Sequence, residues 1–283
     1  MEYIGIGIVA AFVRFWGNSL GLYESPDTRV YKSMCNGMKL RNPYRLRWLL
    51  PYLLPPREWI WWSVSMAALV VSCPLMAMFA EANGVPAIWA VLLWVSLPIW
   101  NINIRLGMMP DPVAWMLALL AVVLSVNGYI LPAIAVAMVA GMVAPKAPVF
   151  AALWVLNPWL LIGLVPVVIG HFLLPKGRAL CDEPILNEPW KTGMKIHGGH
   201  IHDATELLLP WGGCMAAMFC GDWRILPAVF VAYAQLLRST DSARLYMWAA
   251  PVVIIGALKV ITVEPLLIIA VLATWFNPYR AES

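Results

Sequence analysis

Residues 59–80 read WIWWSVSMAALVVSCPLMAMFA, a run of 22 positions without a charged side chain. A helix that crosses the hydrocarbon core of a bilayer needs about 20 mostly apolar residues. The run has this length, so it predicts a membrane-spanning helix.

The composition of the whole chain agrees with that prediction. Apolar residues make up 62% of the 283 residues and charged residues only 12%, and the mean hydropathy is strongly positive. A water-soluble globular chain of this composition would have too few polar side chains to cover its surface. We therefore expect an all-α, polytopic bundle of nine or ten spans, an integral multi-pass protein of the plasma (inner) membrane. Apolar windows lie at 3–23, 59–80, 86–101, 112–127, 128–143, 149–173, 206–221, 223–237, 245–260 and 262–276.

Polar clusters between the apolar windows mark membrane edges or functional sites, because charges are costly inside hydrocarbon. We expect residues 1–283 to form a single integral membrane domain, with a surface-helix loop at 24–58 and a long polar loop at 174–205. Spans counted in order place 24–58, 102–111 and 144–147 on the same, outer face. Asn157-Pro158 can divide the window 149–173 into two shorter segments.

Two short amphipathic surface helices are predicted after the first span. Ser25-Pro26 and Asn42-Pro43 each combine a helix cap with a proline at the first helical position. Asn36-Gly37 supplies the usual end of the first of these helices. Both helices are expected to lie flat at the membrane surface.

The acidic residues have local explanations when they are considered one at a time. Asp27 lies one turn before Tyr31, on the same side of the first surface helix. Asp27, Asp111 and Asp241 each stand near the start of a predicted helix, where a carboxylate caps it or complements its dipole. Arg244 can pair with Asp241, three residues before it. None of these acids by itself indicates an enzyme.

Basic residues gather in the first loop, where 24–57 contains seven of them against two acids. Three interpretations stay open: the positive charge of a cytoplasmic loop, binding of anionic lipid headgroups, and recognition of a substrate phosphate. In the third interpretation, Arg45 and Arg47 provide guanidinium groups that bind phosphate oxygens in pairs. All three interpretations involve membrane lipids or a lipid phosphate as partner.

The segment HGGHIHD contains His197, His200 and His202 within a few residues of one another. Zinc sites draw their ligands from a fixed scaffold, whereas Gly198-Gly199 favours an exposed loop, so we expect no metal there. A histidine that acts as a base is a second interpretation. The chain has no basic arm or helix-turn-helix pattern, so nucleic acid is not expected as a partner.

Four segments together suggest a family. They are SPDTRVYKSMCNG at 25–37, NPYRLRWLLPYL at 42–53, LPIWNINIRLGMMPDPVAWMLALLAVVL at 97–124 and STDSARLYMWAAPVVIIGAL at 239–258. In this order they resemble bacterial membrane proteins of the C-type glycosyltransferase (GT-C) superfold, especially the polyprenyl-phosphate-sugar-dependent, mannosyltransferase-like group.

The resemblance implies a role for each matching residue. Asp27 would be the catalytic general base, and the substrate-binding residues would be Tyr31, Arg45, Arg47, Asp111, Lys146, Asp241 and Arg244. Asp27, Asp111 and Lys146 would meet on the outer face. The three histidines would be secondary candidates.

The activity implied is transfer of a sugar, such as the hexose mannose, from a polyprenyl-phosphate carrier to an extracytoplasmic glycan, lipid or protein acceptor. No cofactor is implied, and a divalent-metal requirement is left open. Lys146 stands where relatives tend to have a glutamate, and the chain is short for the superfold. Two alternatives therefore stay open beside the enzyme: a transporter or flippase for a lipid-linked sugar, and a non-catalytic relative of this fold.

Overall fold

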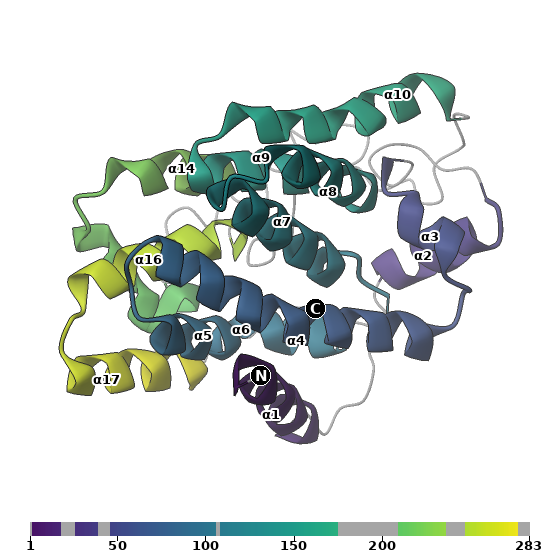
Figure 1. Ribbon diagram of the computed structural model, residues 1–283. Helices are drawn as coiled ribbons and strands as arrows, with labels where there is room; N and C mark the ends of the chain where they lie inside the picture. The colour runs from purple at the N-terminus through teal and green to yellow at the C-terminus, as the bar shows by residue number, and fades with distance from the viewer. Residues whose placement is uncertain are drawn as a thin grey trace. The chain divides into compact units, whose positions relative to one another are not determined.

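The computed structural model describes residues 2–17, 26–38, 46–105, 108–174, 209–235 and 247–276, which form helices joined by short turns, with no strand among them. The helices are labelled in Figure 1. The chain divides into two compact units. Unit 1 comprises Met1–Leu75 and Asn101–Leu180, and unit 2 comprises Met76–Trp100 and Cys181–Ser283.

Among the described helices, only α4, Glu58–Ala82, is long and apolar enough to cross a membrane. In its most apolar stretch, 56% of the residues are buried inside the protein, as in a core helix. The other apolar helices have 10–17 residues, fewer than the roughly 20 that a span needs. The predicted bundle of nine or ten spans is therefore wrong, and so is the predicted location as an integral multi-pass protein of the plasma (inner) membrane.

The physical reason lies in helix breakers inside the apolar windows. Leu97 adopts an extended conformation before Pro98, so the window 86–101 becomes the two short helices α5 (Ala87–Ser96) and α6 (Pro98–Arg105). Leu156 adopts a left-handed conformation and Asn157 caps the next helix, which divides the window 149–173. The mean hydropathy of a window does not show where a helix breaks. It also has the same value whether an apolar side chain faces the protein interior or lipid.

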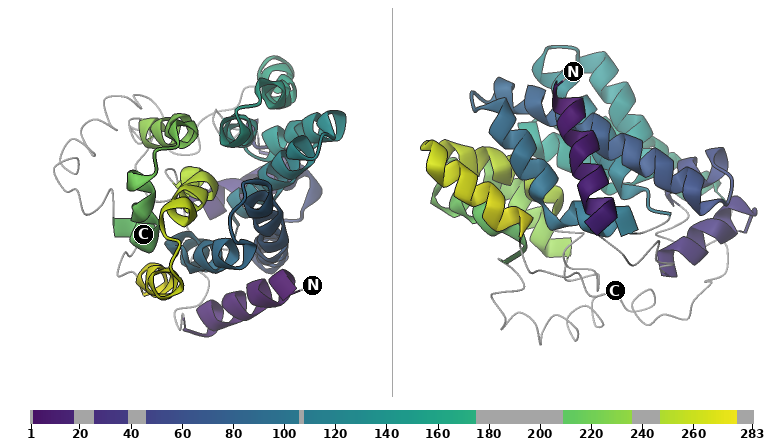
Figure 2. Two further views of the ribbon diagram at one scale, coloured as in Figure 1. Left: turned by 60° about the vertical axis from the view of Figure 1, so that its left-hand side comes forward. Right: turned by 90° about the horizontal axis from the view of Figure 1, so that it is seen from below.

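Unit 1 is built around a helical hairpin. Helix α7 (Asp111–Val126) turns at Gly128, which has a φ of +83°, and α8 (Ile130–Val143) packs back along it. Helices α9 (Lys146–Val155), η2 (Pro158–Leu164) and α10 (Val165–Leu173) then pack against α8 (Figures 1 and 2). The remaining helices are α1 (Glu2–Gly17), α2 (Pro26–Cys35), α3 (Leu49–Leu53), the first part of α4, and most of α6 (Pro98–Arg105).

The surface-helix segment contains two described α-helices. Helix α2 occupies the range between Pro26 and the Asn36-Gly37 pair, with Gly37 at a φ of +82°. In the described part of the second predicted helix, Arg47 and Trp48 are not helical, and α3 (Leu49–Leu53) continues through Pro51, where that helix was expected to kink or end. The start of that helix at Asn42, and the loop from residue 175 onward, lie outside the described residues.

Unit 2 places η3 (Leu209–Phe219) against two helices from the end of the chain, α16 (Ala250–Val260) and α17 (Glu264–Trp275). Helix α5 (Ala87–Ser96) packs against the same two helices. The hydroxyl of Thr274 in α17 accepts the backbone N–H of Gly213 at 2.9 Å, which ties η3 to α17. The unit also contains η4 (Trp223–Ile225), α14 (Leu226–Ala234) and η6 (Met247–Ala249).

Small residues let the helices of unit 1 approach closely, and this packing can be tested at Gly163. A Cβ added at Gly163 would lie 2.7 Å from the backbone carbonyl carbon of Ala137 and 2.8 Å from the Cβ of Pro148. Gly163→Ala is expected to lower the free energy of unfolding by about 1–3 kcal/mol through overpacking. The measurement is denaturant unfolding of the purified chain.

Gly5 in α1 provides the control, because a Cβ there meets nothing within 4 Å. Gly5→Ala is expected to stabilise the chain by about 0.5–1 kcal/mol, since alanine is the better helix former. Equal stability of Gly163→Ala and the parent chain would contradict the described packing of η2 on α8.

Candidate functional site

The first turns of α4 hold two distant segments of unit 1. The Trp61 ring lies 5.6 Å from the Tyr31 ring of α2, measured between centroids. The Trp62 indole N–H donates to the carbonyl of Ile104 at 3.1 Å, and the Ser65 hydroxyl donates to the carbonyl of Met109 at 3.0 Å. Residues 31 and 109 therefore contact positions of α4 that are four residues, or about 6 Å along the axis, apart.

Tyr31 and Arg47 form the first polar pair of the site. Tyr31 is fully buried in α2, and its hydroxyl accepts a hydrogen bond of 2.9 Å from Nη1 of Arg47. Arg47 itself is half-buried, and the Tyr31 hydroxyl holds its guanidinium at Nη1. A guanidinium presents five N–H donors in a rigid fork, so it can bind an anion while Tyr31 holds it.

Asp111 and Lys146 form the second pair, and the α7–α8 hairpin explains why they meet. Helix α7 begins at Asp111, α8 returns alongside it, and α9 begins at Lys146 at the end where α7 started. The Lys146 Nζ lies 3.1 Å from Oδ1 of Asp111. The Asp111 side chain is 1% exposed and that of Lys146 is 16% exposed, so the ammonium is the more accessible end.

The helix dipoles act differently on the two charges. Asp111 is favoured in the first turn of α7, whereas a cation at the first position of α9 meets the positive end of that dipole. The buried carboxylate compensates for this cost, and Lys146 in turn balances a charge that would be expensive to bury alone. A bound anion beside Lys146 would be favoured by the dipole of α9 for the same reason.

These contacts bring four of the predicted substrate-binding residues to one region of unit 1: Tyr31, Arg47, Asp111 and Lys146. Ser65 holds the carbonyl of Met109, two residues before Asp111, while Trp61, four residues before Ser65, lies against Tyr31. Of the three residues predicted to meet on the outer face, Asp111 and Lys146 form an ion pair. The side chain of Asp27, the third, lies outside the described residues. The outer face itself depended on the span count, which is wrong.

Several contacts of this region were not predicted from the sequence. The indoles of Trp61 and Trp62 donate to backbone carbonyls at Pro55 and Ile104, and Lys32 pairs with Glu58 at the start of α4. The signal was present in the two adjacent tryptophans, since a buried indole N–H needs an acceptor. Their spacing alone does not identify that acceptor.

The side chains of the other predicted site residues lie outside the described part of the chain. Asp27 is the second residue of α2, one turn before Tyr31, but its side chain lies outside the described part of the chain. The remaining predicted residues outside the described ranges are Arg45, Asp241, Arg244, His197, His200 and His202. Within the described ranges, no group of three His, Cys, Asp or Glu side chains could hold a metal ion.

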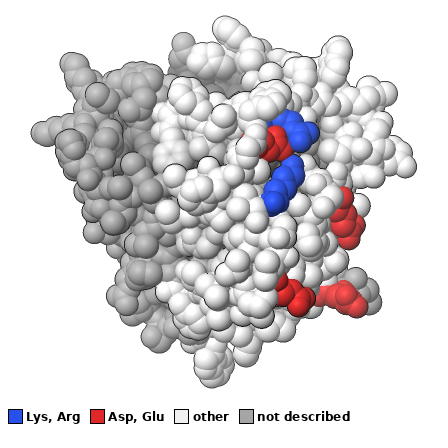
Figure 3. Space-filling model, turned by 90° about the vertical axis from the view of Figure 1, so that its left-hand side faces the viewer, with Lys and Arg blue, Asp and Glu red and all other residues white. Residues whose placement is uncertain are grey.

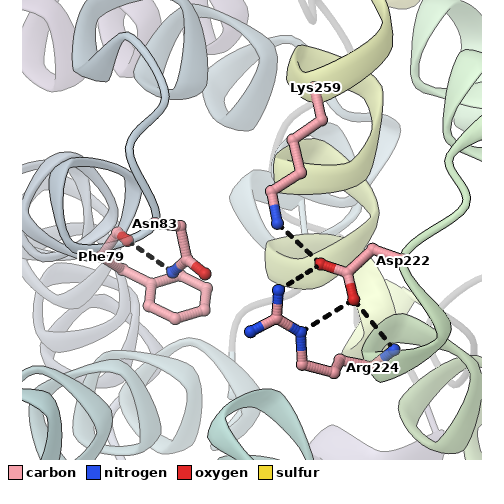
Figure 4. A network of polar contacts seen from close by, with 5 residues as sticks. All are labelled: Phe79, Asn83, Asp222, Arg224 and Lys259. Carbon is pink, nitrogen blue, oxygen red and sulfur yellow. Dashed lines mark hydrogen bonds and ion pairs between the residues drawn. The ribbon is translucent and has the colours of Figure 1, made fainter.

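Unit 2 contains a separate ion cluster around Asp222 (Figure 4). Its carboxylate accepts hydrogen bonds from Nε and Nη2 of Arg224 at 2.8 and 2.9 Å, and from Nζ of Lys259 at 2.7 Å. These two cations, Arg224 above all, hold the pKa of Asp222 well below its usual range. The other bond in Figure 4, from the Asn83 amide to the Phe79 carbonyl, closes the end of α4.

The Asp111–Lys146 pair generates a prediction about stability. Lys146→Met removes one partner of a buried pair and is expected to lower the free energy of unfolding by about 3 kcal/mol or more. The double variant Asp111→Leu/Lys146→Met leaves no unbalanced charge at this site. Its free energy of unfolding should therefore fall by less than that of Lys146→Met. The measurement is urea unfolding, and a double variant less stable than Lys146→Met would contradict the pairing.

Cys35 reports on the same region because it follows Tyr31 by one turn of α2. Burial raises the pKa of the Cys35 thiol above its ordinary value of 9.0. In a variant that keeps only Cys35, the rate of alkylation by iodoacetamide should therefore rise with a midpoint above pH 9.0. A peptide of residues 31–38 is the control, and a midpoint equal to that of the peptide would show that the thiol is not buried.

No protein-family model, curated protein or solved structure matches this chain. The resemblance to C-type glycosyltransferases therefore stays a prediction from the sequence, carried by the four segments quoted above. The geometry of the region at the start of α4 is the independent ground on which a function can be proposed.

Proposed function

We propose that the chain is a glycosyltransferase that moves a sugar from a polyprenyl-phosphate carrier to an acceptor hydroxyl. One observation carries the proposal: Tyr31, which holds Arg47, and Met109, two residues before the Asp111–Lys146 pair, contact neighbouring turns of α4. Each pair consists of a partly accessible cation and a buried oxygen that fixes it. Two such cations suit a phosphate group.

The donor phosphate would interact with Arg47 and Lys146. Arg47 would bind two phosphate oxygens through its fork of N–H groups, and Tyr31 would keep that fork in place. Lys146 would add a point charge next to the start of α9, where the positive end of the helix dipole also favours an anion. Both contacts would strengthen as the phosphate becomes the leaving group and gains charge.

The reaction needs one base and one leaving group. The acceptor oxygen forms a bond to the anomeric carbon, the bond from that carbon to the phosphate oxygen breaks, and its electron pair leaves with the phosphate. The acceptor proton passes to a carboxylate, for which we propose Asp27, as the resemblance implies. Asp111 would be a positioning residue, because its carboxylate is buried against Lys146.

The proposal concerns only the phosphate and sugar end of the donor, so it requires no bundle of spans. It also needs no nucleotide-binding domain, because the phosphate belongs to the lipid carrier. The sugar and the acceptor are the open parts of the proposal.

The proposal predicts loss of transfer when Arg47 is removed. Arg47→Ala should lower kcat/KM for a polyprenyl-phosphate hexose by about 10–100-fold, the factor that one charge-assisted hydrogen bond contributes.

Asp27→Asn should lower kcat by about 100-fold or more through loss of the base. The measurement is transfer of radiolabelled sugar from the donor to an acceptor glycan by the purified chain.

Arg29→Ala is the matched control, because Arg29 is an exposed cation in the same helix as Tyr31. Its activity should equal that of the parent chain. An equal loss in both arginine variants would mean that the charge of the segment matters and Arg47 does not. Full activity of Asp27→Asn would remove Asp27 from the mechanism.

A further inference from the structure

A short helical rod in unit 2 is apolar on two opposite sides. It consists of η4 (Trp223–Ile225) followed directly by α14 (Leu226–Ala234). The inner side contributes Ile225, Ala228 and Ala232, which are buried. An ordinary surface helix would be polar on the opposite side.

The outer side is apolar as well. Trp223, Leu226 and Phe230 follow one another at spacings of three and four residues, so they lie on one side of the rod. With Phe219, which ends η3 just before the rod, they form what we call the outer stripe. The four side chains are between 60% and 83% exposed. Exposing such an apolar surface to water is unfavourable, so we expect an apolar partner to cover it.

Among the described residues, charge beside the outer stripe lies at its Trp223 end. Asp222 and Arg224 flank Trp223, and Lys259 of α16 also bonds to the Asp222 carboxylate (Figure 4). The two cations and one acid of this cluster leave a net positive charge, and the Arg224 side chain is 61% exposed. On the face in Figure 3, the charged atoms of the described residues, basic and acidic, lie in small groups among uncharged atoms.

We propose that the outer stripe docks on an anionic phospholipid surface. Its apolar side chains would enter the boundary between headgroups and acyl chains, with Trp223 at headgroup depth and Arg224 and Lys259 at the lipid phosphates. The rod would lie in the surface and not cross it, because its 12 residues are fewer than the roughly 20 that a span needs. This inference is independent of the proposed transferase activity.

The chemistry favours lipid over a protein partner. In the described range 223–234, the side chains with hydrogen-bonding groups are those of Trp223, Arg224 and Tyr233. The Tyr233 hydroxyl accepts the indole N–H of Trp211 at 2.8 Å, so it has a partner within unit 2, and an exposed tryptophan is typical of side chains at headgroup depth. A protein interface usually has a polar rim around its apolar centre, whereas the described charges beside the outer stripe lie at the Trp223 end.

The experiment is flotation of the purified full chain with vesicles of phosphatidylcholine, with or without phosphatidylglycerol. The parent chain should bind the anionic vesicles more tightly, and added salt should weaken that binding. Arg224→Gln should lower binding to anionic vesicles about fivefold. Leu226→Gln/Phe230→Gln should lower binding to both kinds of vesicle roughly tenfold or more.

Leu131→Gln in α8 is the control, because Leu131 is equally exposed but no lysine or arginine lies in 126–136. Its binding should equal that of the parent chain, and circular dichroism melts should show that each variant is folded. Unchanged binding of both outer-stripe variants, or an equal loss with Leu131→Gln, would overturn the proposal. So would a parent dimer that Leu226→Gln/Phe230→Gln converts to a monomer while vesicle binding is retained, since a second copy would then be the partner.

Discussion

The hydrogen bond from Ser65 to the carbonyl of Met109 is the constraint on which the proposed site depends. It fixes the turn before α7 against α4, so it sets where Asp111 begins its helix. Trp62 adds a second bond to the same segment at Ile104, and Trp61 holds α2 from the neighbouring turn. Without these contacts, the two polar pairs would have no common support.

The interior of unit 1 combines close backbone packing with a buried charge. Glycine at 163 lets η2 approach α8 closely, and such packing leaves little room for Asp111 to move. A rigid carboxylate of this kind keeps Lys146 in position. It is a poor base, because the ammonium of Lys146 already balances its charge. The same logic applies to Tyr31, whose burial makes it a support for Arg47.

Local chemistry predicted part of this arrangement. The Ser25-Pro26 and Asn36-Gly37 signals delimit α2, and Asn157-Pro158 divides the window 149–173 as expected. The span count was wrong because hydropathy measures how apolar a window is and does not identify what covers it. Leu97-Pro98 breaks the window 86–101, which was expected to be one span. The roles of Trp62 and Ser65 depend on a partner more than 40 residues away, which no local pattern can provide.

Arg47, held by Tyr31 of α2, and Lys146, held by Asp111 of α7, are proposed to form one phosphate-binding site beside α4. Hydrogen exchange of the backbone amides, with and without a short-chain polyprenyl phosphate, tests this most directly. If one site binds the phosphate, the ligand should slow exchange at residues 46–50 and at 146–150 together, with half-effects at the same ligand concentration. Protection of one segment without the other, or half-effects at different concentrations, would contradict it.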